Sequence, residues 1–340
     1  MLYFDSDYMC GAHPEVLDAL VRTNSEQTVG YGLDKHSENA KRLIREACSS
    51  PDADVWLLVG GTQTNATVID ALLRPHEGVI AVETGHINVH ESGAIEASGH
   101  KVLTLPQHNG KVDAEELRQY LTNFYADDTW QHMVVPGMLY ISFPTECGSI
   151  YTLKELQDLR AVCDEFSIKL YLDGARIGYG LAAHGCDVTL RDIAQLCDVF
   201  YIGGTKEGLM FGEAVVAKNG LLPHFFTIIK QHGALLAKGR MLGVQFEALF
   251  SNNLFSRIAS HAVDLAMKLR EGFIAKGYST AFDSPTNQQF FTLPNDVIDR
   301  LREYASFENW GPRGETETTV RFVTSWATTT DDVANLCELL

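Results

Sequence analysis

The sequence predicts an α/β protein with a mostly parallel, seven-stranded sheet sandwiched by helices, and a smaller α+β domain at its C-terminal end. Two observations support this. Short apolar runs recur along the first two thirds of the chain with helical segments between them, and after residue 219 longer helices and more widely spaced strands follow. Alternating strands and helices are typical of parallel sheets, whose two faces are covered by helices.

The elements of the large sheet can be placed from the residue pattern. A helix predicted over 153–167 has apolar residues at helical spacing, and it begins at a capping box formed by Thr152 and Glu155. The expected strands are residues 55–59, 79–83, 101–105, 138–142, 169–173, 199–203 and 213–218.

The last third of the chain is predicted to be a separate unit. Its elements are a long helical region interrupted by glycines (223–250), an amphipathic helix that ends at a glycine (259–277), strands 288–293 and 319–326, and a helix between them (295–306). We therefore expect an N-terminal segment at the functional site (1–14), a large domain (15–220), and a long connecting helix with a small C-terminal domain (221–340).

Composition and charge exclude several classes of function. The net charge is −17 and no basic run is present, so we expect no nucleic-acid partner. The seven cysteines are scattered without a C-x-x-C pair, which favours reduced thiols over a disulfide framework or a zinc site. The N-terminal residues show no signal-peptide pattern, and no stretch approaches the ~20 apolar residues of a membrane span. A soluble, cytoplasmic protein is expected.

Three loops follow predicted strands and so meet at the carboxyl edge of the sheet, where open α/β sheets bind ligands. Residues 60–63 (GGTQ) open a helix and offer backbone N–H groups to a phosphate, although a plain strand-to-helix turn explains them equally well. Residues 173–176 (DGAR) place a carboxylate where a protonated ring nitrogen would be its partner. A structural pair between Asp173 and Arg176 is the alternative.

The third loop contains Lys206 among glycines, where its amine has room to form an imine. A solvated turn lysine would show the same pattern. Together the loops supply a phosphate site, an anion for a pyridinium and a reactive amine. These are the binding requirements of pyridoxal 5′-phosphate.

A fourth segment places His86 after the second predicted strand, where its ring could stack on the cofactor opposite Ala175. Glu91 is expected to orient His86 or a substrate group. A metal site formed by His86, His90 and Glu91 is the competing interpretation. It requires a regular helix, which the glycine-containing start of this segment disfavours, so we expect no metal.

With these residues in place, the chain resembles the threonine aldolase and β-eliminating lyase family of fold-type-I pyridoxal-phosphate enzymes over nearly its whole length. The similar segments are FDSDYMCGAHPEVLDAL (4–20), VGYGLDKHSENAKRL (29–43), GGTQTN (60–65), VETGHINVHESGAIE (82–96), YLDGARIGYG (171–180), GGTKEGLMFGEAVV (203–216), LLAKGRMLG (235–243) and TVRFVTSWATTTDDV (319–333).

This resemblance implies that Lys206 holds the cofactor as an aldimine, that Asp173 pairs with its ring nitrogen and that His86 stacks on it. Further implied cofactor contacts are Gly61, Thr62, Gln63, Ala175, Thr205 and, across a subunit interface, Lys238 and Arg240. Implied substrate contacts are Ser6, Tyr31, Glu91, His132, Arg176 and Arg321. A homodimer or homotetramer with shared active sites follows from the same resemblance.

The implied reaction is cleavage of the Cα–Cβ bond of L-threonine, L-allo-threonine or a related β-hydroxy-α-amino acid to glycine and an aldehyde, with His86 or His132 as the base. β-Elimination or racemisation at the same site, and a non-catalytic cofactor-binding protein, are the alternatives. The chain departs from the family pattern at Glu207, directly after the lysine, and at ISFPTE (141–146), where L-E-N-T is more familiar. Both departures are expected around the substrate side chain.

Overall fold

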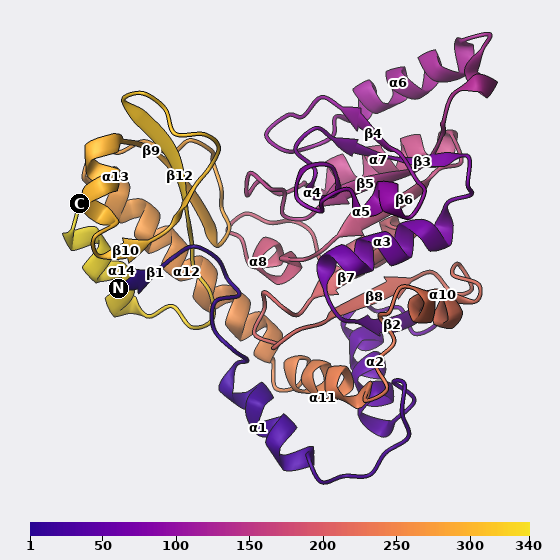
Figure 1. Cartoon of the computed structure of the whole chain (residues 1–340), viewed down its shortest axis with the longest axis horizontal. Coiled ribbons are helices and arrows are strands. Elements are labelled where there is room, and N and C mark those ends of the chain that lie inside the picture. Colours follow the sequence, from indigo (N-terminus) through magenta and orange to yellow (C-terminus); the bar gives the residue numbers. More distant parts are fainter.

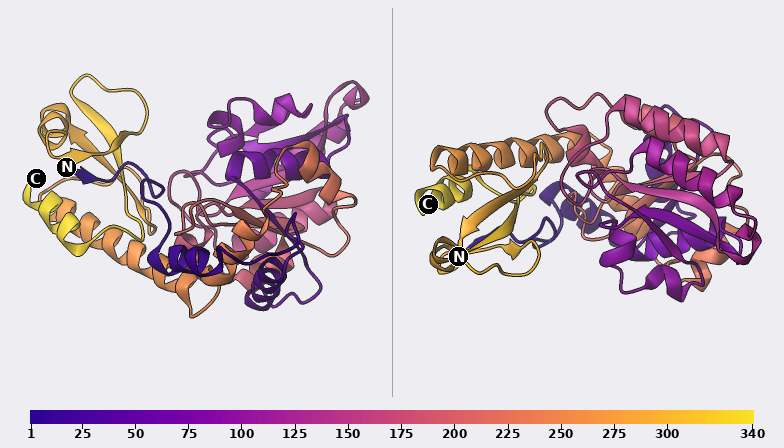
Figure 2. Two further views of the ribbon diagram at one scale, coloured as in Figure 1. Left: turned by 60° about the horizontal axis from the view of Figure 1, so that its bottom comes forward. Right: turned by 90° about the horizontal axis from the view of Figure 1, so that it is seen from above.

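The computed structural model describes all 340 residues and arranges them as two units joined by one long helix (Figure 1). A seven-stranded sheet forms the centre of the large unit, and a three-stranded sheet forms that of the small unit. Helix α12 (Leu254–Ala275) runs from one unit to the other, as Figure 2 shows from two further directions. None of the helices combines the length and hydropathy needed to span a bilayer.

The large sheet has the strand order β2-β8-β7-β6-β5-β3-β4, and only β8 runs antiparallel to its neighbours. Its strands are β2 (Asp54–Leu58), β3 (Glu77–Val82), β4 (Val102–Leu105), β5 (Val135–Ser142), β6 (Lys169–Asp173), β7 (Val199–Gly203) and β8 (Glu213–Ala217). All seven predicted strands are confirmed. The strands are continuous apolar runs because both faces of the sheet are buried. One face packs in the first hydrophobic cluster and the other face in the second.

Helices cover both faces of this sheet. They are α2 (Lys35–Ala47), α3 (Gly61–Leu72), α6 (Ala114–Ala126), α7 (Leu153–Glu165), α9 (Leu190–Leu196) and the short α4 (His86–Val89), α5 (Ala94–Ala97) and α8 (Ile177–Leu181). Helix α7 begins at the predicted capping box: the Thr152 hydroxyl accepts from the Glu155 N–H, and the Glu155 carboxylate accepts from the Thr152 N–H. This predicted helix start is confirmed.

The small unit contains an antiparallel sheet of order β11-β12-β9. Its elements are β9 (Gln288–Pro294), α13 (Asn295–Leu301), β10 (Ala305–Ser306), β11 (Glu308–Asn309), β12 (Glu317–Val323) and α14 (Thr330–Glu338). The helix predicted over 295–306 therefore ends early, because the chain turns back into β10. Strand β10 pairs in parallel with β1 (Leu2–Tyr3), which ties the N-terminus to this unit.

The region 223–250 is not one helical stretch. It forms α10 (Phe225–Gln231) and α11 (Arg240–Leu249), separated by an irregular link. Helix α10 packs on α3, and α11 packs on α1 (Pro14–Thr23) and α2, so both lie with the large unit. We therefore propose that the large domain extends through Leu249, beyond the expected boundary at 220, and that α12 is the connecting helix.

Candidate active site

A cavity of about 340 Å³ opens at the carboxyl ends of β5, β6 and β7. Parallel strands place their carboxyl ends at one edge of the sheet, so the loops that follow them converge there. Eight of the predicted site residues line this cavity: Gly61, Thr62, His86, Asp173, Ala175, Arg176, Thr205 and Lys206. The phosphate loop, the aspartate loop and the lysine loop therefore meet, as the sequence predicts.

Asp173, the last residue of β6, is buried and held by four hydrogen bonds. The donors are Tyr201 Oη (2.5 Å), Tyr140 Oη (2.6 Å), Ala175 N–H (2.9 Å) and Asn65 Nδ2 (3.0 Å). Burial alone would raise the pKa of Asp173, but the neighbouring His86 and the hydrogen bonds hold it below its ordinary value. The site thus has a fixed negative charge at its base.

Sequence reasoning missed the two tyrosines that hold Asp173, although a signal for them was present. Strands β5, β6 and β7 each place a tyrosine two residues before the strand's last residue: Tyr140, Tyr171 and Tyr201. Since side chains alternate along a strand, these rings lie on the same face as the strand ends. Tyr171 donates to Asn65 Oδ1 (2.7 Å) and so orients the amide that donates to Asp173.

His86 is fixed by a buried carboxylate. Its Nδ1 lies 2.7 Å from Glu91 Oε1, and Asn65 Nδ2 also donates to this oxygen at 2.7 Å. Glu91 is buried and does not line the cavity, so it contacts His86 and not a substrate position. His90 lies beside His86, with the ring centroids 5.5 Å apart, and no group of three or more His, Cys, Asp or Glu side chains is arranged for a metal ion.

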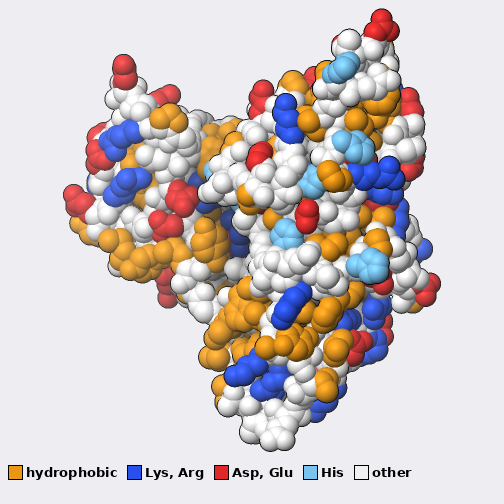
Figure 3. Space-filling view, turned by 45° about the vertical axis from the view of Figure 1, so that its right-hand side comes forward, with side chains coloured by type: hydrophobic (Ala, Val, Ile, Leu, Met, Phe, Trp, Pro, Cys, Tyr) orange, Lys and Arg blue, Asp and Glu red, His pale blue; other side chains and the backbone are white.

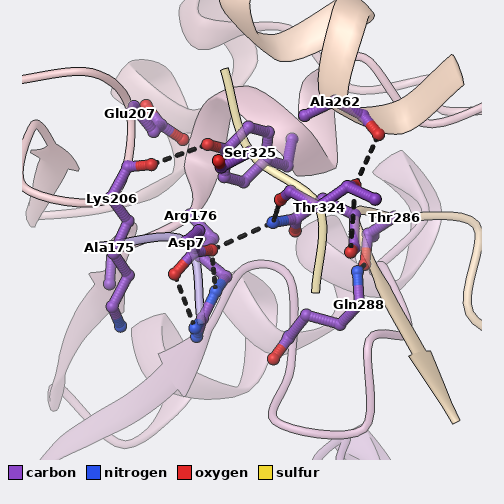
Figure 4. A network of polar contacts seen from close by, with 12 residues as sticks. Asp7, Ala175, Arg176, Lys206, Glu207, Ala262, Thr286, Gln288, Thr324 and Ser325 are labelled. Atoms are coloured by element: carbon purple, nitrogen blue, oxygen red, sulfur yellow. Dashed lines mark hydrogen bonds and ion pairs between the residues drawn. The ribbon is translucent and has the colours of Figure 1, made fainter. Parts of the chain in front are cut away.

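Lys206 follows β7, and its Nζ makes no hydrogen bond or ion pair with another side chain. Burial lowers the pKa of this amine, and the positive charge of Arg176 lowers it further. Figure 4 shows the Lys206 and Arg176 side chains extending in the same direction. The end of β7 and the aspartate loop approach closely only because residue 203 is glycine: a Cβ there would lie 2.2 Å from the carbonyl oxygen of Ala175. A lysine with a lowered pKa is a suitable nucleophile.

Glu207, the residue after this lysine, points away from the cavity (Figure 4). One of its oxygens accepts from the Gly178 N–H (2.6 Å), and the other is buried without a partner. The expectation that it lies around a substrate side chain is therefore wrong, because the turn after Lys206 directs alternate residues to opposite sides.

Arg176 pairs with Asp7 and not with Asp173. Its Nε and Nη2 donate to the two carboxylate oxygens of Asp7 at 2.6 and 3.0 Å, and Asn287 Nδ2 of the small unit donates to the same carboxylate at 2.9 Å (Figure 4). This cluster joins the N-terminal chain to both units. Of the guanidinium, only Nη1 remains without a protein partner. Ser6, expected to contact a substrate, is buried outside the cavity, whereas its neighbour Tyr8 lines it.

Arg321, the other expected carboxylate ligand, does not line the cavity. The register of β11 and β12 places it opposite Glu308, with which it forms an ion pair, and its Nη1 donates to Gln288 Oε1 (3.0 Å). Its guanidinium also lies over the Trp310 ring, 5.1 Å from the centroid. In this structure the two terminal nitrogens of Arg321 are engaged within the chain, whereas its Nε is buried without a hydrogen-bond partner.

Two predicted contacts lie away from the cavity for clear reasons. His132 is exposed in a 3₁₀ turn (Trp130–His132) that precedes β5, so it lies at the amino end of a strand whose carboxyl end forms the site. A strand of this length spans roughly 26 Å, and the prediction for His132 is wrong within this chain. Gln63 lies in α3, where its Nε2 donates to the His232 carbonyl (3.0 Å).

Three further predicted contacts lie outside the chain's own cavity. Tyr31 is 43% exposed, with Lys230 Nζ 4.8 Å from its ring centroid. Lys238 is exposed, and Arg240 donates to the carbonyls of Thr23 and Asn24 at 2.6 and 3.0 Å. None of the three lines the cavity.

The residues around the cavity fit pyridoxal 5′-phosphate. The N-terminus of α3 presents free backbone N–H groups at Gly61 and Thr62, where a phosphate is favoured. The ionised Asp173 suits a protonated ring nitrogen, and Lys206 supplies an amine with no competing partner. The phosphate loop lies close to the tyrosines of the sheet, since a Cβ on Gly61 would lie 3.3 Å from Tyr201 Oη.

Comparisons with known proteins agree with this site. A family model described as beta-eliminating lyase matches residues 4–294. The chain is 30% identical to the low specificity L-threonine aldolase of Pseudomonas aeruginosa over 340 residues, covering 98% of this chain and 95% of that protein. It also superposes on a solved threonine aldolase of Leishmania major with a TM-score of 0.96 and 43% identity, covering 100% and 98% of the two chains.

A more distant similarity concerns the fold alone. The aspartate aminotransferase of Thermus thermophilus superposes with a TM-score of 0.72 at 16% identity, covering 100% of this chain and 90% of that one. The large parallel sheet with a small C-terminal unit is thus the aminotransferase-like, fold-type-I architecture. With the family model spanning most of its length and its site residues gathered at one cavity, the chain belongs to the β-eliminating lyase family.

Proposed function

We propose that the chain is a pyridoxal-phosphate-dependent lyase that cleaves the Cα–Cβ bond of L-threonine, L-allo-threonine or a related β-hydroxy-α-amino acid to glycine and an aldehyde. The observation that supports this best is the position of Lys206, half-buried and with an unpartnered amine, in the same cavity as the ionised Asp173 and the N-terminus of α3. The relatives described as threonine aldolases indicate the substrate class.

Each residue has a definite task toward the cofactor in this proposal. Lys206 would hold its aldehyde carbon, the Asp173 carboxylate would accept a hydrogen bond from its protonated ring nitrogen, and the N–H groups of Gly61 and Thr62 would bind the phosphate. His86, oriented by Glu91, would contact the ring. When bound, the cofactor supplies an electron sink for the pair left on Cα.

The substrate is oriented by the charged cluster at the N-terminal chain. Arg176 offers Nη1 to the substrate carboxylate while Asp7 holds the other side of the guanidinium, which fixes its plane. A carboxylate held at a fixed position limits rotation about the bond to the amino nitrogen. The Cα–Cβ bond can then be aligned for cleavage in preference to the Cα–H bond.

We also propose a homodimer or homotetramer in which subunits share active sites. Tyr31 and Lys238 are exposed outside their own cavity, and Arg240, which donates to the carbonyls of Thr23 and Asn24, also lies outside it. Figure 3 shows hydrophobic side chains gathered on the lower part of the molecule, where α1 and the chain after it lie in Figure 1. Exposed large apolar residues of this part are Leu17, Val21, Val29 and Leu33. The seven free cysteines support a reducing, cytoplasmic location.

A product assay tests the reaction. The purified protein loaded with cofactor is incubated with L-threonine, L-allo-threonine, phenylserine and L-serine, and the products are identified. Glycine with the matching aldehyde is expected from the β-hydroxy substrates. Formation of pyruvate or 2-oxobutyrate with ammonia would instead show β-elimination and would contradict the proposal. The Lys206→Ala variant should lose both the visible absorbance of the lysine-bound cofactor and all turnover.

A mixing experiment tests the shared site. Lys206→Ala and Arg240→Ala are each expected to be inactive, because one lacks the amine and the other the contact from the neighbouring subunit. Subunits of the two variants, denatured and refolded together, should recover up to about a quarter of wild-type activity if sites are shared. No recovery, with wild-type subunits refolding normally in parallel, would show that each chain builds its site alone.

A further inference from the structure

Glu146 lies in the segment that follows β5 and lines the same cavity as Lys206 and Asp173. Its Oε1 accepts two hydrogen bonds, one from Ser142 Oγ (2.7 Å) and one from the backbone N–H of His86 (3.0 Å). Its Oε2 is buried and has no partner. The carboxyl group is therefore held in place through one oxygen while the other is left free.

A free carboxyl oxygen inside a cavity requires an explanation, because buried polar atoms without partners are uncommon. Burial raises the pKa of Glu146, and the negative charge of Asp173 adds to this, although Ser142 and His86 act in the opposite sense. A carboxyl group that exchanges its proton at higher pH than an ordinary glutamate is suited to acid–base chemistry. Glu146 thus lines the cavity with a buried, unpartnered oxygen and a carboxyl group whose pKa is raised, and these observations motivate the following proposal.

We propose that Glu146 is the acid–base residue for the β-hydroxyl of the substrate, an inference that rests on the proposed function. In cleavage, Oε2 takes the hydroxyl proton, the O–H electron pair becomes the second C–O bond of the leaving aldehyde, and the Cα–Cβ pair stays with Cα. Cα then acquires one proton, which balances the proton taken by Glu146, and the product is glycine. In the reverse direction the protonated Glu146 returns its proton to the alkoxide.

The other candidates at the cavity are less suited to this role. His86 uses Nδ1 in its contact with Glu91 and, although its Nε2 has no partner, its ring is the group proposed to stack on the cofactor; His132 lies at the far edge of the sheet. Asp173 is held ionised by four donors. Glu213, the remaining carboxyl group of the cavity, accepts from the Gly204 N–H (3.1 Å) in the lysine loop. Glu146 is the lining carboxyl group with a buried oxygen left unpartnered.

The test separates cleavage from chemistry that needs no hydroxyl. In Glu146→Gln the amide oxygen can still accept from Ser142 and His86, but no proton can be taken. Threonine cleavage should fall by about 10²–10⁴-fold. Exchange of the glycine Cα proton in D₂O, followed by NMR, should stay within threefold of wild type because glycine has no β-hydroxyl. Binding of pyridoxal phosphate to the apoprotein, followed by intrinsic fluorescence, should stay within twofold.

Glu207→Gln is the matched control. It replaces a carboxyl group that is more deeply buried than Glu146 and that also has one bonded and one unpartnered oxygen, but that does not line the cavity. Its cleavage rate should stay within threefold of wild type. In Glu146→Ala, added formate should raise the cleavage rate at least tenfold, since a small carboxylate can occupy the vacated volume and take the proton.

The outcomes distinguish this inference from the proposed function. Wild-type protein that cleaves threonine, together with Glu146→Gln that cleaves within fivefold of it, overturns the role of Glu146 alone. An equal loss of cleavage and glycine exchange in Glu146→Gln also overturns it, because the residue would then act on the cofactor site as a whole. Wild-type protein that cleaves none of the β-hydroxy substrates removes the proposed function and this inference together.

Discussion

The tyrosines that hold Asp173 allow a quantitative prediction about cofactor binding. Tyr140 and Tyr201 each donate a hydrogen bond to this carboxylate, at 2.6 and 2.5 Å. A hydrogen bond to a charged group contributes roughly 1.5–3 kcal/mol, so the double variant Tyr140→Phe/Tyr201→Phe should weaken the preference of Asp173 for its ionised form by on the order of 10²–10⁴-fold. The pKa of Asp173 should rise accordingly.

This change should make cofactor binding depend on pH. A raised pKa means that Asp173 gains a proton as the pH falls, and a neutral carboxyl group no longer attracts a cationic ring nitrogen. The dissociation constant of pyridoxal phosphate, divided by the wild-type value at the same pH, should be at least tenfold larger at pH 5.5 than at pH 8. Dividing by the wild-type value cancels the pH dependence that comes from titration of the cofactor phosphate and of the Lys206 amine, because both proteins share that titration.

Equilibrium titration of the apoproteins, followed by intrinsic fluorescence at several pH values, measures this ratio. Tyr171→Phe is the matched control, because Tyr171 is buried on the same face but donates to Asn65 (2.7 Å) and not to Asp173. Its ratio should change with pH far less than that of the double variant, because Tyr171 acts on Asp173 only through the Asn65 amide. A constant ratio in the double variant would refute the reasoning that these phenols keep Asp173 ionised.

Two further predictions concern stability. Gly203→Ala should lower the free energy of unfolding by several kcal/mol, because its Cβ would lie 2.2 Å from the Ala175 carbonyl oxygen. Gly11→Ala is the control and should change this free energy little, because a Cβ there would have no atom within 4 Å. Urea denaturation measures both variants, and equal effects would contradict the close approach at Gly203. Glu213→Gln should remove a pH dependence: burial raises the pKa of Glu213 from 4.5 to about 8, so between these values the folded chain retains a proton that the unfolded chain has released, and stability falls as the pH rises. The wild-type protein should therefore lose up to roughly 1.4 kcal/mol per pH unit relative to the variant in that window, and parallel stability profiles in urea would count against it.

The sequence could predict the sheet and the meeting of its loops because both depend on local pattern. Apolar runs mark buried strands, and the carboxyl ends of parallel strands share an edge, so Asp173 and Lys206 meet whatever the details of packing. The tyrosine two residues before the end of each of three strands was a signal for the partners of Asp173, but which of these tyrosines meets the carboxylate depends on the register between strands. The pairing of Arg176 with Asp7 depends on the path of the N-terminal chain, for which a single sequence contains no signal.

The structure gives two carboxyl groups of one cavity opposite environments, and this difference assigns their roles. Asp173 accepts four hydrogen bonds that stabilise its charge, as a permanent partner for a cation requires. Glu146 has both its donors on one oxygen, so its second oxygen can take or release a proton. His86 connects the two, because its backbone N–H positions Glu146 while its ring lowers the pKa of Asp173. The departure from the family pattern at residues 141–146 thus includes the residue proposed to take the proton of the β-hydroxyl. In that proposal a reaction specific to β-hydroxy amino acids depends on Glu146 more than on the lysine, which all reactions of this site would share.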